Sequence, residues 1–183
     1  MRESHQKEAP YPKSKKIDKK KDEVFIDIED KDPVWLKDKG DHFYKRNDFL
    51  GAIRAYGRAI EEDKEFLTAR LNRATVFAKV RSFVPAIEDC TDCMTQIEAM
   101  KPEDISEDKE FFDKIYARAL LKRAACNAWT SRFDDAIADF TAIVETEKHS
   151  SIFTKEELYN FQQDILRIGK RKESLKLKQE GDY

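Results

Sequence analysis

Glycine and proline are scarce in this sequence, with five of each among 183 residues. Sheets need frequent turns, and turns consume these two residues, so the shortage favours an all-α fold. No stretch approaches the roughly 18 to 20 uninterrupted apolar residues of a membrane span, and the N-terminus lacks the apolar core of a secretory signal. We therefore expect a cytoplasmic protein without a membrane partner.

A surplus of one charge is also missing. The 35 lysine and arginine residues nearly balance the 37 aspartate and glutamate residues, so the chain lacks the basic excess that favours non-specific binding to nucleic acid. We expect no nucleic-acid partner. Three cysteines, an odd number, suit a reducing compartment better than a set of disulfides.

The first 31 residues differ from the rest. Lysines crowd residues 13–21, and apolar residues are few, so this segment cannot build a core and is predicted to be a flexible, lysine-rich linker. Residues 24–28, Val-Phe-Ile-Asp-Ile, alternate weakly and lie beside further acidic residues. They would also suit an extended segment that docks on a partner or on the chain itself, so both interpretations stay open.

A sequence repeat begins after Pro33. Five positions recur with a shift of 34 residues and then of a further 50, so the third copy carries an insertion before its first helix. The recurring residues are Gly40, Phe43, Ala52, Tyr56 and Ala59, then Ala74, Phe77, Ala86, Cys90 and Cys93, then Ala124, Asn127, Ala136, Phe140 and Ile143. Of these, Asn127 fits the pattern poorly.

The repeated residues have a physical purpose. Small residues let two antiparallel helices approach closely, and bulky ones fill the gap between successive pairs. The pattern predicts three helical hairpins, at about 33–63, 66–98 and 109–147.

A further helix is expected beyond the third hairpin. Apolar residues recur at helical spacing within residues 155–178, and this helix should cover the exposed face of the last repeat. The predicted organisation is a linker over residues 1–31, a repeat domain over 32–153, and a capping helix with its tail over 154–183.

Two stretches resemble the tetratricopeptide-repeat (TPR) domains of co-chaperones, which bind the C-terminal tails of heat-shock chaperones. Trp35-Leu36-Lys37-Asp38-Lys39-Gly40-Asp41 is similar to the opening of such domains, and Leu71-Asn72-Arg73-Ala74 is similar to the start of their second repeat. The resemblance covers about residues 33–147. It implies a right-handed superhelix of three TPR hairpins.

The resemblance also implies a peptide-binding site. In that family a carboxylate clamp holds the terminal aspartate of a Glu-Glu-Val-Asp tail. By position, Lys37, Asn72, Arg118 and Lys122 match clamp residues, with the two basic types of the last pair exchanged. Asp41 stands where the family has an asparagine that donates to the tail carboxylate.

Asp41 should weaken the clamp. A carboxylate accepts hydrogen bonds and cannot donate one to an anion, so repulsion replaces attraction. Lys37 lies four residues earlier on the same helix face and can pair with Asp41, which would also draw Lys37 away from a ligand.

Within this group, Asp-Pro-Val-Trp-Leu-Lys-Asp-Lys-Gly from Asp32 and the insertion before the third repeat look most like the C-terminal TPR domain of the dynein axonemal assembly factor family once called the dyslexia-susceptibility candidate proteins. That resemblance implies a co-chaperone adaptor that holds the tail of a heat-shock-protein-90 or -70 type chaperone during assembly of axonemal dynein arms. Other dynein assembly factors are further possible partners, and the chain would be part of a longer protein.

Other features are interpreted as structural. Cys90 and Cys93 form a Cys-x-x-Cys pair, but both fall on repeat positions of the core and no second ligand pair accompanies them, so we expect neither metal nor redox chemistry. Tyr116, Trp129 and Phe133 could line a pocket, but we expect them to pack in the core between repeats. Neither a glycine-rich phosphate loop nor a catalytic pattern is found in the sequence, so we expect no enzyme activity and no cofactor.

Two alternatives to the carboxylate clamp stay open. A TPR scaffold could hold an internal segment of an assembly partner on the same face, in which case a free terminal carboxylate would not matter. A metal or redox protein that uses Cys90 and Cys93 would carry zinc.

Overall fold

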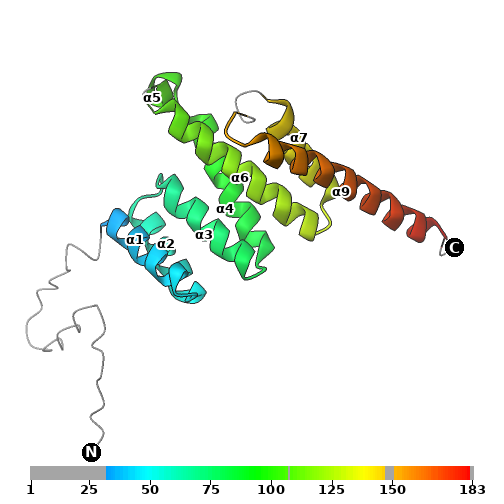
Figure 1. The fold of residues 1–183 in the computed structure, drawn as a ribbon. Coiled ribbons are helices and arrows are strands. Elements are labelled where there is room, and N and C mark those ends of the chain that lie inside the picture. The colour runs from blue at the N-terminus through cyan, green and yellow to red at the C-terminus, as the bar shows by residue number, and fades with distance from the viewer. Residues whose placement is uncertain (1–31, 107, 147–150, 182–183) are drawn as a thin grey trace, which may run out of the picture.

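The computed structural model describes residues 32–106, 108–146 and 151–181. In these ranges the regular structure is helical throughout, and the chain runs as successive antiparallel hairpins followed by a long final helix (Figure 1). The helices are α1 (Pro33–Lys45), α2 (Phe49–Glu62), α3 (Leu67–Lys79), α4 (Phe83–Ala99), α5 (Pro102–Ser106), α6 (Lys109–Trp129), α7 (Phe133–Glu145) and α9 (Lys155–Gly181). The predicted linker over residues 1–31 lies outside the described residues.

The first hairpin begins and turns at residues with local reasons to do so. The side chain of Asp32 caps α1 by accepting a hydrogen bond of 3.0 Å from the backbone N–H of Val34, and Pro33 occupies the first turn of the helix. Asp48 caps α2 in the same way, accepting 2.9 Å from Gly51.

All three hairpin turns share one backbone conformation. The equivalent residues Asn47, Arg81 and Ser131 have φ values of 60°, 61° and 62°. Non-glycine residues adopt this left-handed region only at some cost, so its recurrence shows that the turn geometry is required by helix packing in each repeat.

The small residue at the start of the repeat pattern allows close helix contact. A Cβ atom built on Gly40 would lie 2.5 Å from Cε1 of Tyr56, which is 2% exposed. The equivalent residues Ala74 and Ala124 are fully buried. The interpretation of this position as a site of helix approach is therefore confirmed.

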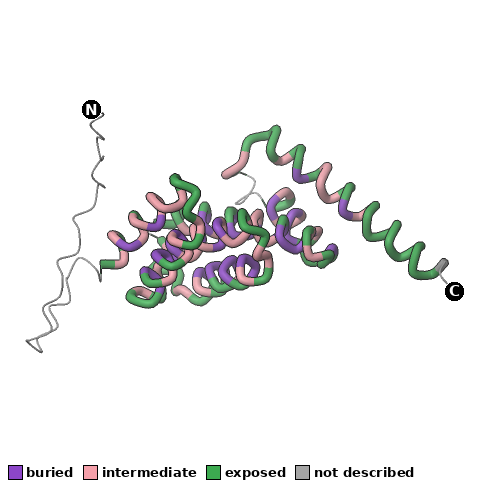
Figure 2. Tube along the Cα trace, turned by 90° about the horizontal axis from the view of Figure 1, so that it is seen from below, coloured by how far each residue is buried: buried purple, intermediate pink, exposed green. Residues whose placement is uncertain are grey.

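Buried residues line the hairpins, and the final helix is only partly covered (Figure 2). Phe161 and Ile168 of α9 join the core that includes Phe140 of α7, and the rings of Phe140 and Phe161 lie 5.9 Å apart. From residue 170 to residue 180 every side chain of α9 is exposed. The first part of α9 thus caps the last hairpin, as the sequence predicts.

Partly buried ion pairs join the two helices of the second and third hairpins. Arg73 donates to both carboxylate oxygens of Asp89 at 2.8 and 2.7 Å. Arg123 does the same to Asp139, 50 residues later, at 2.9 and 2.7 Å. Both aspartates are buried, so each pair depends on the fork geometry of arginine.

Two details differ from the sequence prediction. Trp129 is 60% exposed instead of packing in the core; its ring is stacked on Phe83, with centroids 6.0 Å apart. The helix-breaking residues after α4 form the short helix α5, where a plain loop was expected, because Pro102 ends one helix and starts another.

Candidate functional site

The predicted peptide-binding residues come from the first helix of each hairpin. Lys37 and Asp41 lie on α1, Asn72 on α3, and Arg118 and Lys122 on α6. Helix α3 contacts both α1 and α6, so these three helices form one continuous surface, which we call the inner face. These five residues do not form a single clamp. They divide into a half near α1, with Lys37 and Asp41, and a half near α6, with Arg118 and Lys122.

Asp41 is the centre of the half near α1. Lys37 Nζ lies 2.9 Å from Asp41 Oδ2. The hydroxyl of Tyr56 donates to Asp41 Oδ1 at 2.5 Å, and Asn72 Nδ2 donates to the same oxygen at 3.0 Å. Three donors therefore surround the Asp41 carboxylate, and the predicted Lys37–Asp41 pair forms.

The protonation of these donors reflects that carboxylate. The hydrogen bond to Asp41, followed by one to Asp38, raises the pKa of Lys37, so this lysine keeps its charge at neutral pH. Burial raises the pKa of Tyr56, and its hydrogen bond to Asp41 raises it further, so the phenol stays a neutral donor. This half of the inner face has its charges satisfied within the chain.

The half near α6 is more open and faces a cavity of about 400 Å³. Arg118 is exposed at its edge, and Lys122 is partly buried beside it. Burial lowers the pKa of Lys122, which means that its ammonium has lost part of its hydration. The residues that line this cavity are Leu71, Asn72, Thr75, Arg118, Leu121, Lys122, Ile152, Phe153 and Glu157.

The far wall of this cavity belongs to the C-terminal segment. Ile152 and Phe153 precede α9, and Glu157 lies in its first turn. Glu157 is engaged in a capping box, since its Oε2 accepts from the backbone and hydroxyl of Thr154, at 2.8 and 2.9 Å. The wall is therefore apolar apart from one carboxylate that already has hydrogen-bond partners.

Asn72 and Thr75 separate the two halves. A small cavity of about 90 Å³ lies on the Asp41 side, and both residues line it as well as the larger cavity. The amide of Asn72 thus faces the larger cavity while its nitrogen donates to Asp41. A ligand carboxylate would meet two cations and this shared amide.

Sequence reasoning identified the cations but missed their neighbours. Tyr56 was recognised only as a packing residue of the repeat, and its hydroxyl bond to Asp41 had no sequence signal. Ile152 and Phe153 follow the last repeat, so the repeat spacing does not predict where they lie. The Thr-x-x-Glu spacing of the capping box at residue 154 was the one detectable sign.

The cysteines lie in the core, as predicted. Cys90 and Cys93 are fully buried, and burial raises the pKa of both thiols, that of Cys93 to about 12. Within the described residues, no group of three or more histidine, cysteine or acidic side chains is placed to hold a metal ion. None of the described helices combines the length and the apolar composition that a membrane span requires.

No family model matches the chain, but known proteins and solved structures are similar to it. DnaJ homolog subfamily C member 7 of Mus musculus is 30% identical over 145 residues, 77% of this chain and 26% of that protein. Dynein axonemal assembly factor 4 of Rattus norvegicus is 38% identical over 72 residues, 38% of this chain and 17% of that protein. The chain therefore spans about a quarter or less of the length of these relatives.

Solved structures show the same fold. The TPR2B domain of yeast Sti1, in its complex with pHsp70, has a TM-score of 0.59 at 19% identity, and the match covers 76% of this chain and 97% of that domain. The first TPR domain of Spaghetti (RPAP3), bound to the HSP90 peptide SRMEEVD, has a TM-score of 0.53 at 18% identity, with coverage of 75% and 95%. The prediction of an all-α TPR fold with a capping helix, and the resemblance to co-chaperone and dynein assembly factor TPR domains, are confirmed.

Proposed function

From the TPR fold and the inner face, we propose that the chain is a protein-binding adaptor, not an enzyme. Its inner face holds the acidic C-terminal tail of a heat-shock chaperone of the 70 or 90 type in the cytoplasm. The observation that carries the proposal is the convergence of Asn72, Arg118 and Lys122 on one cavity with an apolar wall. Charged and amide donors suit a carboxylate, and the wall suits the apolar side chains of a short tail.

The relatives support this choice of ligand. Two of the structural neighbours are complexes with chaperone ligands: the Sti1 domain with pHsp70, and the Spaghetti domain with a peptide of HSP90. The similarity to dynein axonemal assembly factor 4 supports assembly of axonemal dynein arms as the process in which the adaptor acts.

The tail would bind first to the α6 half of the face. The guanidinium of Arg118 can bind a carboxylate through two parallel hydrogen bonds. Lys122 adds a partly desolvated charge, whose attraction to an anion is stronger than that of a fully hydrated lysine. Binding should therefore depend on the free carboxylate and weaken as salt rises.

Asp41 limits the affinity of this site. It already accepts hydrogen bonds from Tyr56 and Asn72 and pairs with Lys37, so it occupies donors that a ligand carboxylate would need. Losing a hydrogen bond to a charged group costs about 1.5–3 kcal/mol, which corresponds to roughly ten- to hundredfold weaker binding.

A fluorescence titration of labelled Met-Glu-Glu-Val-Asp peptide tests the proposal. We expect a dissociation constant in the range of about 1–100 μM, loss of binding for the C-terminally amidated peptide, and at least about tenfold weakening in Arg118→Ala. Lys114→Ala is the matched control, because Lys114 is a cation of α6 that pairs with Glu110 away from the cavity. Equal binding of the free and amidated peptides would contradict the proposal.

A scaffold function without a carboxylate clamp is the second candidate. The engagement of Asn72 and Lys37 by Asp41 favours it, because these donors are then satisfied without any ligand. In that case the cavity beside Leu121 and Phe153 would hold an internal segment of an assembly partner, and amidation of a peptide would leave its affinity unchanged.

A further inference from the structure

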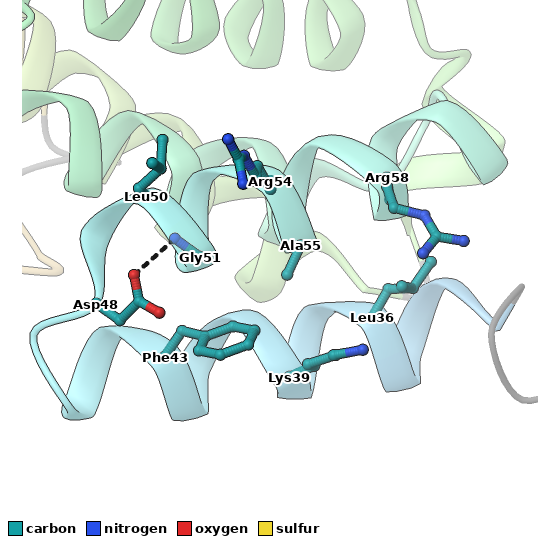
Figure 3. A pocket seen from close by; sticks show the side chains of 9 residues that line it. All are labelled: Leu36, Lys39, Phe43, Asp48, Leu50, Gly51, Arg54, Ala55 and Arg58. Atoms are coloured by element: carbon teal, nitrogen blue, oxygen red, sulfur yellow. Dashed lines mark hydrogen bonds between the residues drawn. The ribbon is translucent and has the colours of Figure 1, made fainter. Parts of the chain in front are cut away.

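A second groove lies between α1 and α2, away from the inner face. Lys39 lines it, and because residues two apart on a helix do not face each other, it lies on a different side of α1 from Lys37. The cavity has a volume of about 360 Å³ (Figure 3). Its lining residues are Leu36, Lys39, Phe43, Asp48, Leu50, Gly51, Arg54, Ala55 and Arg58.

The groove coincides with a missing ion pair. In the third hairpin, Arg123 and Asp139 form a partly buried pair between the two helices, and the second hairpin has its own equivalent. At the same two repeat positions the first hairpin has Lys39 and Ala55. The cation is kept, but a methyl group stands where the other hairpins have a carboxylate.

The charge around the groove is strongly of one sign. Lys39, Arg54 and Arg58 line it together with one carboxylate, that of Asp48. That carboxylate is already used, since it caps α2 by accepting from Gly51. The ammonium of Lys39 lies 4.5 Å from the ring centroid of Trp35, a contact that compensates it only in part. Among the described residues that line the groove, Lys39 therefore has no counterpart to the carboxylate that pairs with the equivalent arginines.

The residues that line the groove change from charged to apolar along its length. Figure 3 shows Arg58 opposite Leu36 at one end, Ala55 and Arg54 opposite Lys39 in the middle, and Leu50 opposite Phe43 at the other end. Leu50 is 59% exposed, so its side chain is available to an apolar ligand group. From the start of α1 onward, the order is cation, cation, apolar.

We propose that this groove binds residues 24–30 of the same chain, Val-Phe-Ile-Asp-Ile-Glu-Asp, as an extended segment that runs back along α1. Side chains of an extended segment alternate, so Phe25, Asp27 and Glu29 share one face. Counted backward from α1, these side chains are Glu29, Asp27 and Phe25, which are two acidic residues followed by an aromatic one. This order matches the cation, cation and apolar order of the groove residues. Asp27 would lie beside Lys39 and supply the carboxylate that is missing at position 55.

The length of the segment suits this placement. It is joined to the capping residue Asp32 by Lys31 alone. Five extended residues span about 16 Å, and the ten helical steps of α1 from Pro33 to Phe43 rise about 15 Å. The segment therefore reaches Phe43 after one reversal of direction. The chain itself can therefore supply a carboxylate beside Lys39.

Amide NMR spectra of the full 15N-labelled chain test the proposal with variants outside the folded core. Phe25→Ala and Asp27→Asn should shift the amide resonances of groove residues such as Lys39 and Gly51. Ile26→Ala is the control, because this side chain lies on the other face of the segment, and it should leave those resonances nearly unchanged. If neither Phe25→Ala nor Asp27→Asn moves the groove resonances, the proposal is wrong.

A second variant tests the role of the missing carboxylate. Ala55→Asp places an acid beside Lys39, as Asp139 lies beside Arg123, and should release the segment. The resonances of residues 24–30 should then move to those of a synthetic peptide of the same sequence in isolation. Groove shifts that grow with protein concentration would assign the contact to a neighbouring copy and overturn binding within one chain.

Discussion

Asn72 on α3 donates a 3.0 Å hydrogen bond to Asp41 on α1, and the two residues lie 31 positions apart in the chain. This bond turns a residue proposed to recognise a ligand carboxylate toward a carboxylate of the chain itself. Because Lys37 and Tyr56 converge on the same side chain, Asp41 takes the place of an anionic ligand in half of the inner face.

Replacing Asp41 with asparagine should strengthen binding of the carboxylate peptide. Asp41→Asn removes the repulsion and supplies an amide donor, so we expect about ten- to hundredfold tighter binding in the peptide titration. Asp38→Asn is the control, because Asp38 also pairs with Lys37, at 3.0 Å, but is largely exposed. An equal gain in both variants would assign the effect to net charge alone.

The contact of Gly40 with Tyr56 should make this glycine sensitive to substitution. Gly40→Ala forces the buried tyrosine ring to move, so we expect a loss of about 1–3 kcal/mol in the free energy of unfolding. Urea unfolding followed by circular dichroism measures it. Gly169→Ala on α9 is the control: nothing lies within 4 Å of its added Cβ, so this change should be neutral or stabilising. Similar losses in both variants would show that close packing is not the cause.

Lys122 should make peptide binding sensitive to alkaline pH. Burial lowers its pKa, so its charge is lost at a lower pH than that of an exposed lysine, and affinity for a carboxylate falls as pH rises through that pKa. Lys122→Arg keeps its charge. Between about pH 7 and pH 10 the wild-type affinity should fall more than that of the variant. Parallel curves would show that Lys122 does not contact the carboxylate.

The cysteines should resist modification while the chain is folded. Burial raises the pKa of Cys93 to about 12, and Cys90 is shifted in the same direction. The thiolate fraction of such a group is roughly a thousandfold below that of an exposed cysteine. We expect negligible alkylation of the native protein by iodoacetamide and full alkylation in denaturant, measured by mass. Rapid labelling of the native protein, or bound zinc, would favour the metal or redox alternative.

The repeated positions made the hairpins predictable. The interval from Gly40 to Ala74 places equivalent small residues where helices must approach, and packing between neighbouring repeats depends mainly on such local spacing. The four-residue interval from Arg118 to Lys122 likewise places both cations on one helix face. Trp129 was mispredicted because the repeat pattern assigns a helix but does not say which aromatic residues the neighbouring helices leave uncovered.

The sequence by itself determined the helical hairpins, the small residues between them and the cations of the inner face, because each depends on periodicity along one or two helices. Only the tertiary structure decided that Tyr56 and Asn72 are directed at Asp41, that Ile152 and Phe153 wall the larger cavity, and that the first hairpin lacks a carboxylate beside Lys39. These features join residues far apart in the chain. Their hydrogen bonds and cavities exist only once helix packing has set the distances between side chains.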